Sequence, residues 1–180
     1  MARKTGKWTA RDLTATALMA VLICVCTWIA IPGPVPFTLQ TFAVFTAVEL
    51  LGARRGFWAV ASYLLMGAAG LPVFSGMAGG AGILLGQTGG YLWGFLMVPL
   101  LCRGITALAG HGKPARITGM LLGMATCYAV GTAWFVFVNG GVGWGGALAV
   151  CVLPFLIPDS IKLMLALSFA GALRKRKIFS

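Results

Sequence analysis

Charged residues are scarce in this 180-residue sequence, and acidic residues are almost missing from it. Asp and Glu together number 3, His occurs once, and charged residues make up 9% of the chain. Because soluble domains carry roughly 25% charged residues, this composition argues against a soluble globular protein. The single histidine, His111, lies in the sequence GHGKP. Without a second histidine in an apolar segment, it does not predict a metal site.

Several catalytic motifs are missing as well. The chain has no G-x-x-x-x-G-K-[ST] phosphate-binding loop, which argues against an ATPase activity of its own. No serine occupies a G-x-S-x-G elbow, and no histidine lies in an apolar segment to activate one. An intramembrane hydrolase is therefore disfavoured, and we expect a protein that is not an enzyme and needs no cofactor.

Apolar residues are abundant instead. They make up 59% of the chain, and their runs are long enough to span a bilayer. The strands of a β-barrel would alternate apolar and polar residues, whereas a stretch such as ALMAVLICVCTWIAI (17–31) does not. The sequence thus predicts an all-α integral membrane protein with one domain over residues 1–180. The five cysteines are scattered through the apolar runs, so we expect small packing residues rather than a metal or disulfide framework.

Six apolar segments separated by Pro- or Gly-rich breaks are expected to form transmembrane helices. They cover roughly residues 13–31, 37–51, 56–70, 88–105, 117–138 and 154–173. The first is longer than the roughly 7–15 apolar residues of a signal peptide, so we expect a retained helix. The second and third are short for a hydrocarbon core of ~30 Å. We therefore expect residues 71–87, which follow them, to fold over the bundle from outside as a lid.

The basic residues, which give the chain a net charge of +11, test this topology. All but one of the 14 Lys and Arg residues lie before the first segment, between the second and third, at the break between the fourth and fifth, or after the sixth. This distribution satisfies the positive-inside rule for six spans with both termini in the cytoplasm. The residues concerned are Arg3, Lys4, Lys7, Arg11, Arg54, Arg55, Arg103, Lys113, Arg116, Arg174, Lys175, Arg176 and Lys177.

The remaining basic residue, Lys162, lies three positions after Asp159 in the apolar stretch LPFLIPDSIKLML (153–165). The two opposite charges therefore share one face of a helix. A charge deep in a bilayer costs ~2.5–3.5 kcal/mol, faces the bundle interior and usually has a function. Pro158 is expected near the helix start, where the helix dipole would stabilise the carboxylate. We favour a pair that faces a ligand; the alternative is an ion pair that only clamps the helix to its neighbours.

The two other acids have simpler interpretations. Asp12 follows Arg11 at the start of the first segment, and Glu49 lies near Arg54 and Arg55 at the end of the second. We expect both to be interfacial charges that nearby basic residues balance.

Around Asp159 and Lys162, the sequence predicts an outward-opening pocket for a small, partly apolar molecule with both donors and acceptors. A carboxylate and an ammonium can bind opposite ends of a polar group in a dry site. The expected lining combines aromatic and neutral polar side chains, namely Phe37, Phe74, Tyr91, Trp144, Gln40, Gln87 and Asn139.

Three segments resemble the BioY family, the biotin-capturing S components of energy-coupling factor (ECF) vitamin transporters. They are VPFTLQTF (35–42), GLPVFSGMAGGAGILLGQTGGYLWGF (70–95) and PDSIK (158–162). The similarity extends over essentially the whole chain, and the middle segment is its most specific part. That segment departs from the family pattern at Gln87, where proline is common, and at Met77 and Ala78.

The resemblance implies the S-component fold with six helices in the cytoplasmic membrane, which binds biotin from outside. A membrane T component and a pair of cytoplasmic ABC-type ATPases would be its partners. Asp159 would accept from a ureido N–H of biotin, and Lys162 would donate to the ureido oxygen, steady Asp159 or meet the carboxylate of biotin. Gln40 and Tyr91 would meet the thiophane or valerate portion, under a lid that includes Phe74, Gln87 and Gly90, with Phe37 beside it.

The family also carries small residues four apart on its first helix, which dock on the T component. Thr16 and Ala20 fit this pattern. From spacing alone, we expect internal packing of the bundle for them and for the pairs Gly90–Gly94 and Gly119–Gly123, while Thr16 and Ala20 could also face a partner protein. Three other functions stay open at this point: an S component for another vitamin, a structural or assembly subunit without a ligand, and a proton-coupled permease that uses Asp159.

Overall fold

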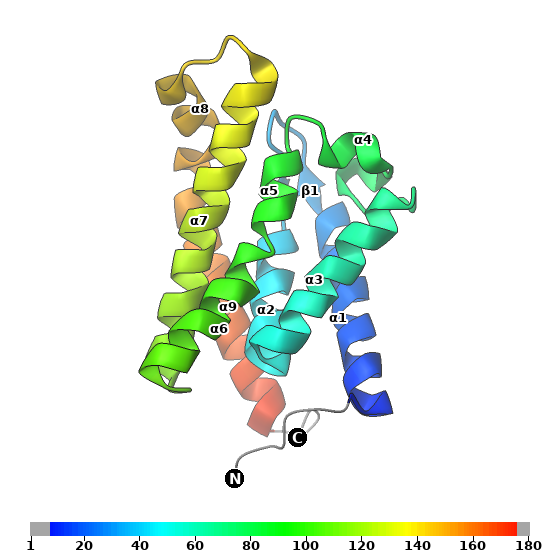
Figure 1. Cartoon of the computed structure of the whole chain (residues 1–180), viewed down its shortest axis with the longest axis vertical. Helices are drawn as coiled ribbons and strands as arrows, with labels where there is room; N and C mark the ends of the chain where they lie inside the picture. Colours follow the sequence, from blue (N-terminus) through cyan, green and yellow to red (C-terminus); the bar gives the residue numbers. More distant parts are fainter. Residues whose placement is uncertain (1–7, 176–180) are drawn as a thin grey trace.

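The computed structural model describes residues 8–175, which form a bundle of helices with one short hairpin (Figure 1). The positive charges at Arg3, Lys4, Lys7, Arg176 and Lys177 lie outside the described residues. The elements are α1 (Ala10–Trp28), β1 (Ala30–Ile31), β2 (Phe37–Thr38), α2 (Gln40–Leu51), α3 (Ala53–Ala68), the 3-10 turn η1 (Ser75–Met77), α4 (Ala81–Leu84), α5 (Gly89–Gly94), α6 (Met97–Ala109), α7 (Lys113–Asn139), α8 (Trp144–Cys151) and α9 (Leu153–Lys175).

Four helical stretches are long and apolar enough to cross a membrane. They are Ala10–Trp28, Gly89–Ala109, Lys113–Asn139 and Trp144–Arg174. The prediction of an all-helical, multi-pass membrane protein is therefore confirmed. The first expected segment ends earlier, because residues 29–38 turn into the β1–β2 hairpin, and the sixth is preceded by the unpredicted helix α8.

Helix α2 is short because it lies inside the bundle. It packs on α1, α3 and α9, and 10 of its 12 residues are buried. Ala43 and Ala47, for example, are 0% exposed. By contrast, large apolar side chains on α1, α7 and α9, such as Leu18, Phe137 and Met164, are more than half exposed, as lipid-facing residues would be.

Local sequence signals explain several helix ends. Thr9 and Asp12 form a capping box at the start of α1, in which each side chain accepts from the other's backbone N–H. Gly52, with φ of 82°, allows the abrupt turn between α2 and α3. Gly140 takes the left-handed conformation that ends α7. These positions help to set where α1 begins and where α2 and α7 end.

Glycines allow α7 to approach α5 and α6 closely. A Cβ on Gly123 would lie 2.4 Å from the Cα of Val98, and one on Gly119 would lie 2.6 Å from the Cα of Cys102. A Cβ on Gly90 would lie 2.3 Å from the Cβ of Trp134. The expected internal packing is therefore confirmed for these pairs of small residues. Thr16 and Ala20 are also buried, at 6% and 2% exposed.

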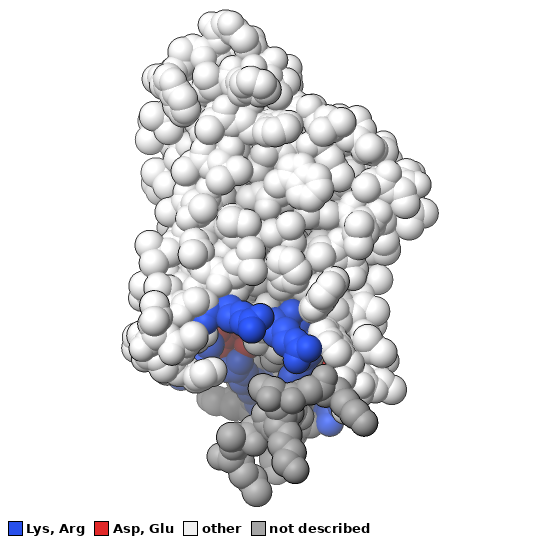
Figure 2. Space-filling model, in the orientation of Figure 1, with Lys and Arg blue, Asp and Glu red and all other residues white. Residues whose placement is uncertain are grey.

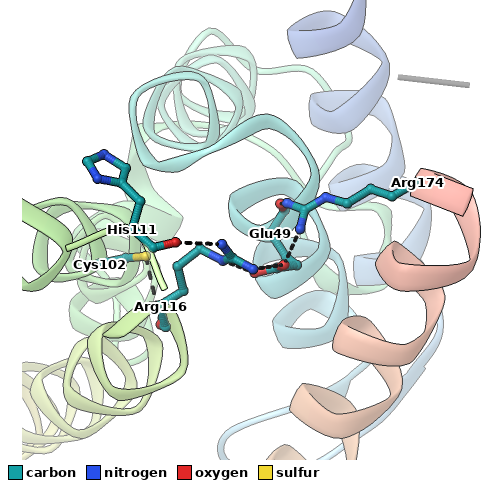
Figure 3. A network of polar contacts seen from close by, with 5 residues as sticks. All are labelled: Glu49, Cys102, His111, Arg116 and Arg174. Carbon is teal, nitrogen blue, oxygen red and sulfur yellow. Dashed lines mark hydrogen bonds and ion pairs between the residues drawn. The ribbon is translucent and has the colours of Figure 1, made fainter. Parts of the chain in front are cut away.

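Basic side chains gather at one end of the bundle, and Figure 2 shows them around an acidic residue. Figure 3 shows the centre of this cluster, where Glu49 of α2 is 5% exposed. Arg116 of α7 donates to both carboxylate oxygens, at 3.0 Å each. Arg174 of α9 donates to Oε1 at 2.8 Å and also to the backbone carbonyl of Glu49. The expected local balance of Glu49 by Arg54 and Arg55 is thus replaced by arginines from two other helices.

Asp12, in the first turn of α1, has a basic partner. In addition to its capping role, it pairs with Arg55 of α3 at 2.8 Å. This ion pair joins the start of α1 to the start of α3, so a basic residue balances Asp12, as expected.

Candidate functional site

A cavity of about 140 Å³ lies inside the end of the bundle opposite the Glu49 cluster. Helices α1, α2, α5, α7, α8 and α9 contribute to its walls, together with residues of the hairpin and of the 71–88 segment. Most of its wall area is apolar, as in many small-molecule sites, although about half of the lining residues carry a polar side-chain group. The lining residues are Thr27, Val35, Pro36, Thr38, Gln40, Thr41, Phe74, Ser75, Ile83, Thr88, Tyr91, Leu92, Phe95, Met124, Cys127, Tyr128, Cys151, Phe155, Asp159 and Lys162.

The carboxylate of Asp159 is the most densely bonded group in the cavity. Its Oδ1 accepts from Thr41 Oγ1 at 2.8 Å and from Lys162 Nζ at 2.8 Å, while its Oδ2 accepts from Tyr128 OH at 2.5 Å. Asp159 is 4% exposed. Donors from α2, α7 and α9 therefore satisfy one buried charge, and they hold it in a fixed position.

The ammonium of Lys162 is equally constrained. Besides Asp159, it donates to the backbone carbonyl of Thr38 at 2.6 Å. It also lies 4.1 Å from the centre of the Phe37 ring, a favourable cation–π distance. Lys162 is 5% exposed, so water contributes little to its solvation. The pairing of Asp159 with Lys162 on one helix face, predicted from their spacing, is confirmed.

The β1–β2 hairpin brings the Thr38 carbonyl and the Phe37 ring to Lys162. Residues 32–36, PGPVP, form its turn, and Ala30 pairs with Thr38 while Ile31 pairs with Phe37. Prolines favour such a turn because they fix φ and cannot extend a helix. Phe37 then packs on Phe155 of α9, with ring centres 5.8 Å apart.

Pro158 does not begin a helix, as the sequence had suggested. Helix α9 begins at Leu153 and continues through Pro158, so Asp159 lies in its second turn. The helix dipole acts mainly within the first turn. The side-chain donors described above, and not the helix end, therefore stabilise the Asp159 carboxylate.

Tyr91 and Gln40 also line the cavity, as predicted. The Tyr91 hydroxyl shares a hydrogen bond of 2.8 Å with Thr132 Oγ1 of α7. The Tyr91 ring fits against Gly131, where a Cβ would lie 2.2 Å from Cδ1 of the ring. Gln40 is 4% exposed, and its Nε2 atom has no hydrogen-bond partner among the described residues.

The segment before α5 contributes to the cavity wall, and its role as a lid stays a prediction. Phe74, Ser75 and Ile83 line the cavity from this side. The segment is tied down, because Trp28 Nε1 donates to the carbonyl of Pro72 at 2.9 Å. Phe74 is 2% exposed and packs edge-on against Tyr63 of α3, with ring centres 5.5 Å apart. This segment is therefore held against α1 and α3 and is not a loose loop.

Five residues predicted for the site or its lid lie outside the cavity wall. Gln87 is exposed beside the cavity lining, and Gly90 packs against α7 because only a glycine leaves room for Trp134. Trp144 is 60% exposed at the start of α8. Asn139 donates to the carbonyl of Phe135 within α7. Phe37 approaches the site through Lys162 and is not part of the cavity wall itself.

Two side chains that contact Asp159 in the cavity were not predicted from the sequence, namely Thr41 and Tyr128. Both donate to Asp159. Thr41 directly follows Gln40, and Tyr128 is a polar residue within a long apolar run. The sequence context of each therefore indicated a site residue only weakly. Among the residues that the structure describes, no group of three or more His, Cys, Asp and Glu side chains could hold a metal ion, and all five cysteines are free and buried.

Comparisons with known proteins agree on one family. The model of the BioY family matches residues 1–178. The "Biotin transporter BioY" of Thermotoga maritima is 39% identical over 169 residues, which cover 93% of this chain and 98% of that protein. The "Probable biotin transporter BioY" of Pyrococcus horikoshii is 36% identical, with 92% and 97% covered. The crystal structure of the S-component for biotin from an ECF-type ABC transporter superposes with a TM-score of 0.81 at 28% identity, and covers 97% of this chain and 100% of that one.

Proposed function

The chain belongs to the BioY family, and we propose that it is the biotin-capturing S component of an ECF-type vitamin uptake transporter. It is a transport protein and not an enzyme. The observation that carries the proposal is the cavity of about 140 Å³, in which a buried carboxylate and a buried ammonium meet. The similarity to a solved biotin S-component supports the choice of vitamin.

The chemistry of biotin suits this cavity. Its ureido ring offers two N–H donors and one carbonyl acceptor. A carboxylate has about four lone-pair positions, and Asp159 uses three of them for protein donors. One position is therefore left for a ureido N–H. Lys162 lies beside it to meet the ureido oxygen, and the apolar side chains of Phe74, Leu92 and Phe155 surround the remaining volume.

We further propose six transmembrane spans, with both termini in the cytoplasm and the protein in the cytoplasmic membrane. The shorter helices α2 and α3 would supply the two spans that length alone does not identify. The distribution of Lys and Arg favours this orientation. It places the Glu49 cluster on the cytoplasmic side and the cavity, with its cover of residues 71–87, on the outer side.

The partners would be a membrane T component and a pair of ABC-type ATPases. The missing phosphate-binding loop in this chain agrees with such a division of labour. Docking of the T component through Thr16 and Ala20 would require α1 to move, because both side chains are buried in the described structure.

A thermal-shift panel of vitamins on the detergent-purified protein tests the proposal. A ligand at 100 times its Kd should add about 2.7 kcal/mol of stability. We expect biotin to raise the melting temperature and thiamine and riboflavin to leave it unchanged. A shift with another vitamin would reassign the substrate, and no shift with any of them would favour a structural subunit in which Asp159 and Lys162 only clamp helices. Uptake that persists in ATP-free vesicles would instead indicate a proton-coupled permease.

A further inference from the structure

A second cavity, also of about 140 Å³, lies between α7 and α9, and we call it the lateral crevice. Met124, Tyr128 and Asp159 line both this crevice and the ligand cavity described above. The full lining of the crevice is Phe45, Leu121, Met124, Ala125, Tyr128, Leu156, Asp159, Ser160 and Leu163. The crevice is therefore a separate space that shares one wall with the ligand cavity.

The crevice exists because α7 and α9 pack mainly on different neighbours. Helix α7 packs on α5 and α6, whereas α9 packs on α2. Phe45 of α2, which is 2% exposed, forms the floor of the gap between them. At the edges, Leu121 of α7 and Leu156 of α9 are 49% and 44% exposed. The crevice is thus continuous with the apolar surface that faces lipid.

A single hydrogen bond forms the wall that the two spaces share. The hydroxyl of Tyr128 on α7 donates to Oδ2 of Asp159 on α9 at 2.5 Å, and both side chains line the crevice as well as the ligand cavity. An occupant of the crevice would therefore pack on the lipid side of this bonded pair.

The polar groups of the crevice are already bonded within the protein. Besides the bond between Tyr128 and Asp159, the hydroxyl of Ser160 donates to the carbonyl of Leu156 at 2.7 Å. The other side chains of the lining are apolar. An apolar space of this kind stays dry, so water and polar solutes are poor occupants.

The depth of the crevice limits which molecules can reach it. Its α7 residues fall within 121–128 of a helix that runs from Lys113 to Asn139. At 1.5 Å per residue, they lie about 12 Å from one end of the helix and about 16 Å from the other. In a hydrocarbon core of about 30 Å, this is the middle of the bilayer. Lipid tails are present at that depth, whereas headgroups and aqueous solutes are not.

We propose that the lateral crevice binds an acyl chain of a membrane lipid, which packs against Phe45 and covers the Tyr128–Asp159 bond from the lipid side. If nothing packed there, the lining side chains would lose dispersion contacts on one side. The chain also closes the lateral wall of the ligand cavity. This inference stands on the crevice and on its depth in the membrane, so it does not depend on which vitamin the protein binds.

Photocrosslinking in liposomes tests the proposal. The purified chain is reconstituted without partner proteins or biotin into phosphatidylcholine that carries a diazirine in the middle of one acyl chain, and adducts are assigned to residues by tandem mass spectrometry. Lipid around the bundle labels exposed residues in any case. The specific expectation is labelling of Phe45, which bulk lipid does not reach. Val44 of the same helix, 1% exposed and outside the crevice, is the matched control and should stay unlabelled.

Two substitutions should block the crevice from different helices. Ala125→Phe on α7 and Ser160→Phe on α9 each place a ring where the acyl chain would lie. Both positions are exposed, so the added ring does not have to enter the core of the bundle. In either variant, we expect labelling of Phe45 to fall to the level of Val44. Circular dichroism identifies folded variants, and the second variant serves if the first does not fold.

Each blocking variant has a matched control on its own helix. Ala129 and Ser168 are exposed and lie outside the crevice lining. The Ser168 hydroxyl donates to the Met164 carbonyl at 2.9 Å, so Ser168→Phe removes the same kind of bond as Ser160→Phe. Both Ala129→Phe and Ser168→Phe should label Phe45 as the wild type does.

Two results would overturn the proposal. One is labelling of Phe45 in the wild type that does not exceed that of Val44, which is also the result expected if a partner protein fills the crevice. The other is equal labelling of Phe45 in the blocking variants and their controls. Because the assay contains no biotin, a failure of the vitamin to bind would refute the proposed function and leave this test unaffected.

Discussion

Replacing Lys162 by methionine separates a ligand site from a helix clamp. Methionine has a similar length without the charge, and the change deletes all three contacts of the ammonium, at 2.8 Å to Asp159 Oδ1, 2.6 Å to the Thr38 carbonyl and 4.1 Å to the Phe37 ring centre. Asp159, which is 4% exposed, then keeps only two hydroxyl donors for its charge. The perturbation is therefore an uncompensated carboxylate inside the protein.

Removal of one partner from a buried ion pair typically costs about 3–5 kcal/mol, and the burial of Lys162 places it in that class. The loss should appear as a lower melting temperature of the ligand-free protein in detergent. The double variant Asp159→Asn/Lys162→Met has no uncompensated charge. It should regain most of the lost stability, because neutral replacements of a buried pair are often tolerated.

Binding should respond differently from stability. We expect Asp159→Asn and Lys162→Met each to weaken biotin binding by at least about 1.4 kcal/mol, a tenfold loss, and the double variant not to regain it. If the pair were only a clamp, the folded double variant would bind biotin like the wild type. Wild-type affinity in both purified, folded single variants would refute the assignment of these residues to the site.

Three further changes test other parts of the structure. Glu49→Gln leaves two arginines without their carboxylate, so we expect a loss of about 1–3 kcal/mol in stability, measured by thermal unfolding, with unchanged biotin affinity. Gly131→Ala should displace the Tyr91 ring and weaken biotin binding, with a stability cost of about 1–3 kcal/mol, whereas Gly104→Ala, whose Cβ meets no atom, should leave calorimetric affinity unchanged. Trp28→Phe removes the bond that ties the cavity cover to α1, so biotin should dissociate faster in stopped-flow measurements, and an unchanged rate would contradict a closing role.

The sequence could predict the long helices but not the hairpin that follows α1. Apolar runs locate a helix because length and composition suffice, and this holds for α1, α7 and α9. The β1–β2 hairpin has two residues in each strand. Its position depends on contacts with α9, which is far away in the chain. Contacts between residues so far apart in the chain produce no periodic pattern in the short sequence of the hairpin, so the sequence does not predict them.

The site was partly predictable for a similar reason. A charge in an apolar run must be buried against a partner, so Asp159 and Lys162 stood out from composition alone. Neutral polar residues carry no such penalty, and lipid is as apolar as a protein core, so the sequence does not indicate which face of a membrane helix points inward. Gln40 lines the cavity, while Asn139 donates to a carbonyl of its own helix, although hydropathy treats both residues alike.

All three acids of this chain are placed where basic or hydroxyl donors from other helices converge. Asp159 and Glu49 join the same helices, α2, α7 and α9, at opposite ends of the bundle. At the Glu49 end, two arginines oppose one carboxylate, so that end is held together without a ligand. At the Asp159 end, one lysine and two neutral hydroxyls leave acceptor capacity beside a cavity. A ligand that donates a hydrogen bond to Asp159 meets an acceptor that the protein already holds in place. Less side-chain entropy is therefore lost when the ligand binds. The near-absence of acidic residues follows from the same constraint, because a carboxylate in this membrane protein needs several donors from its surroundings.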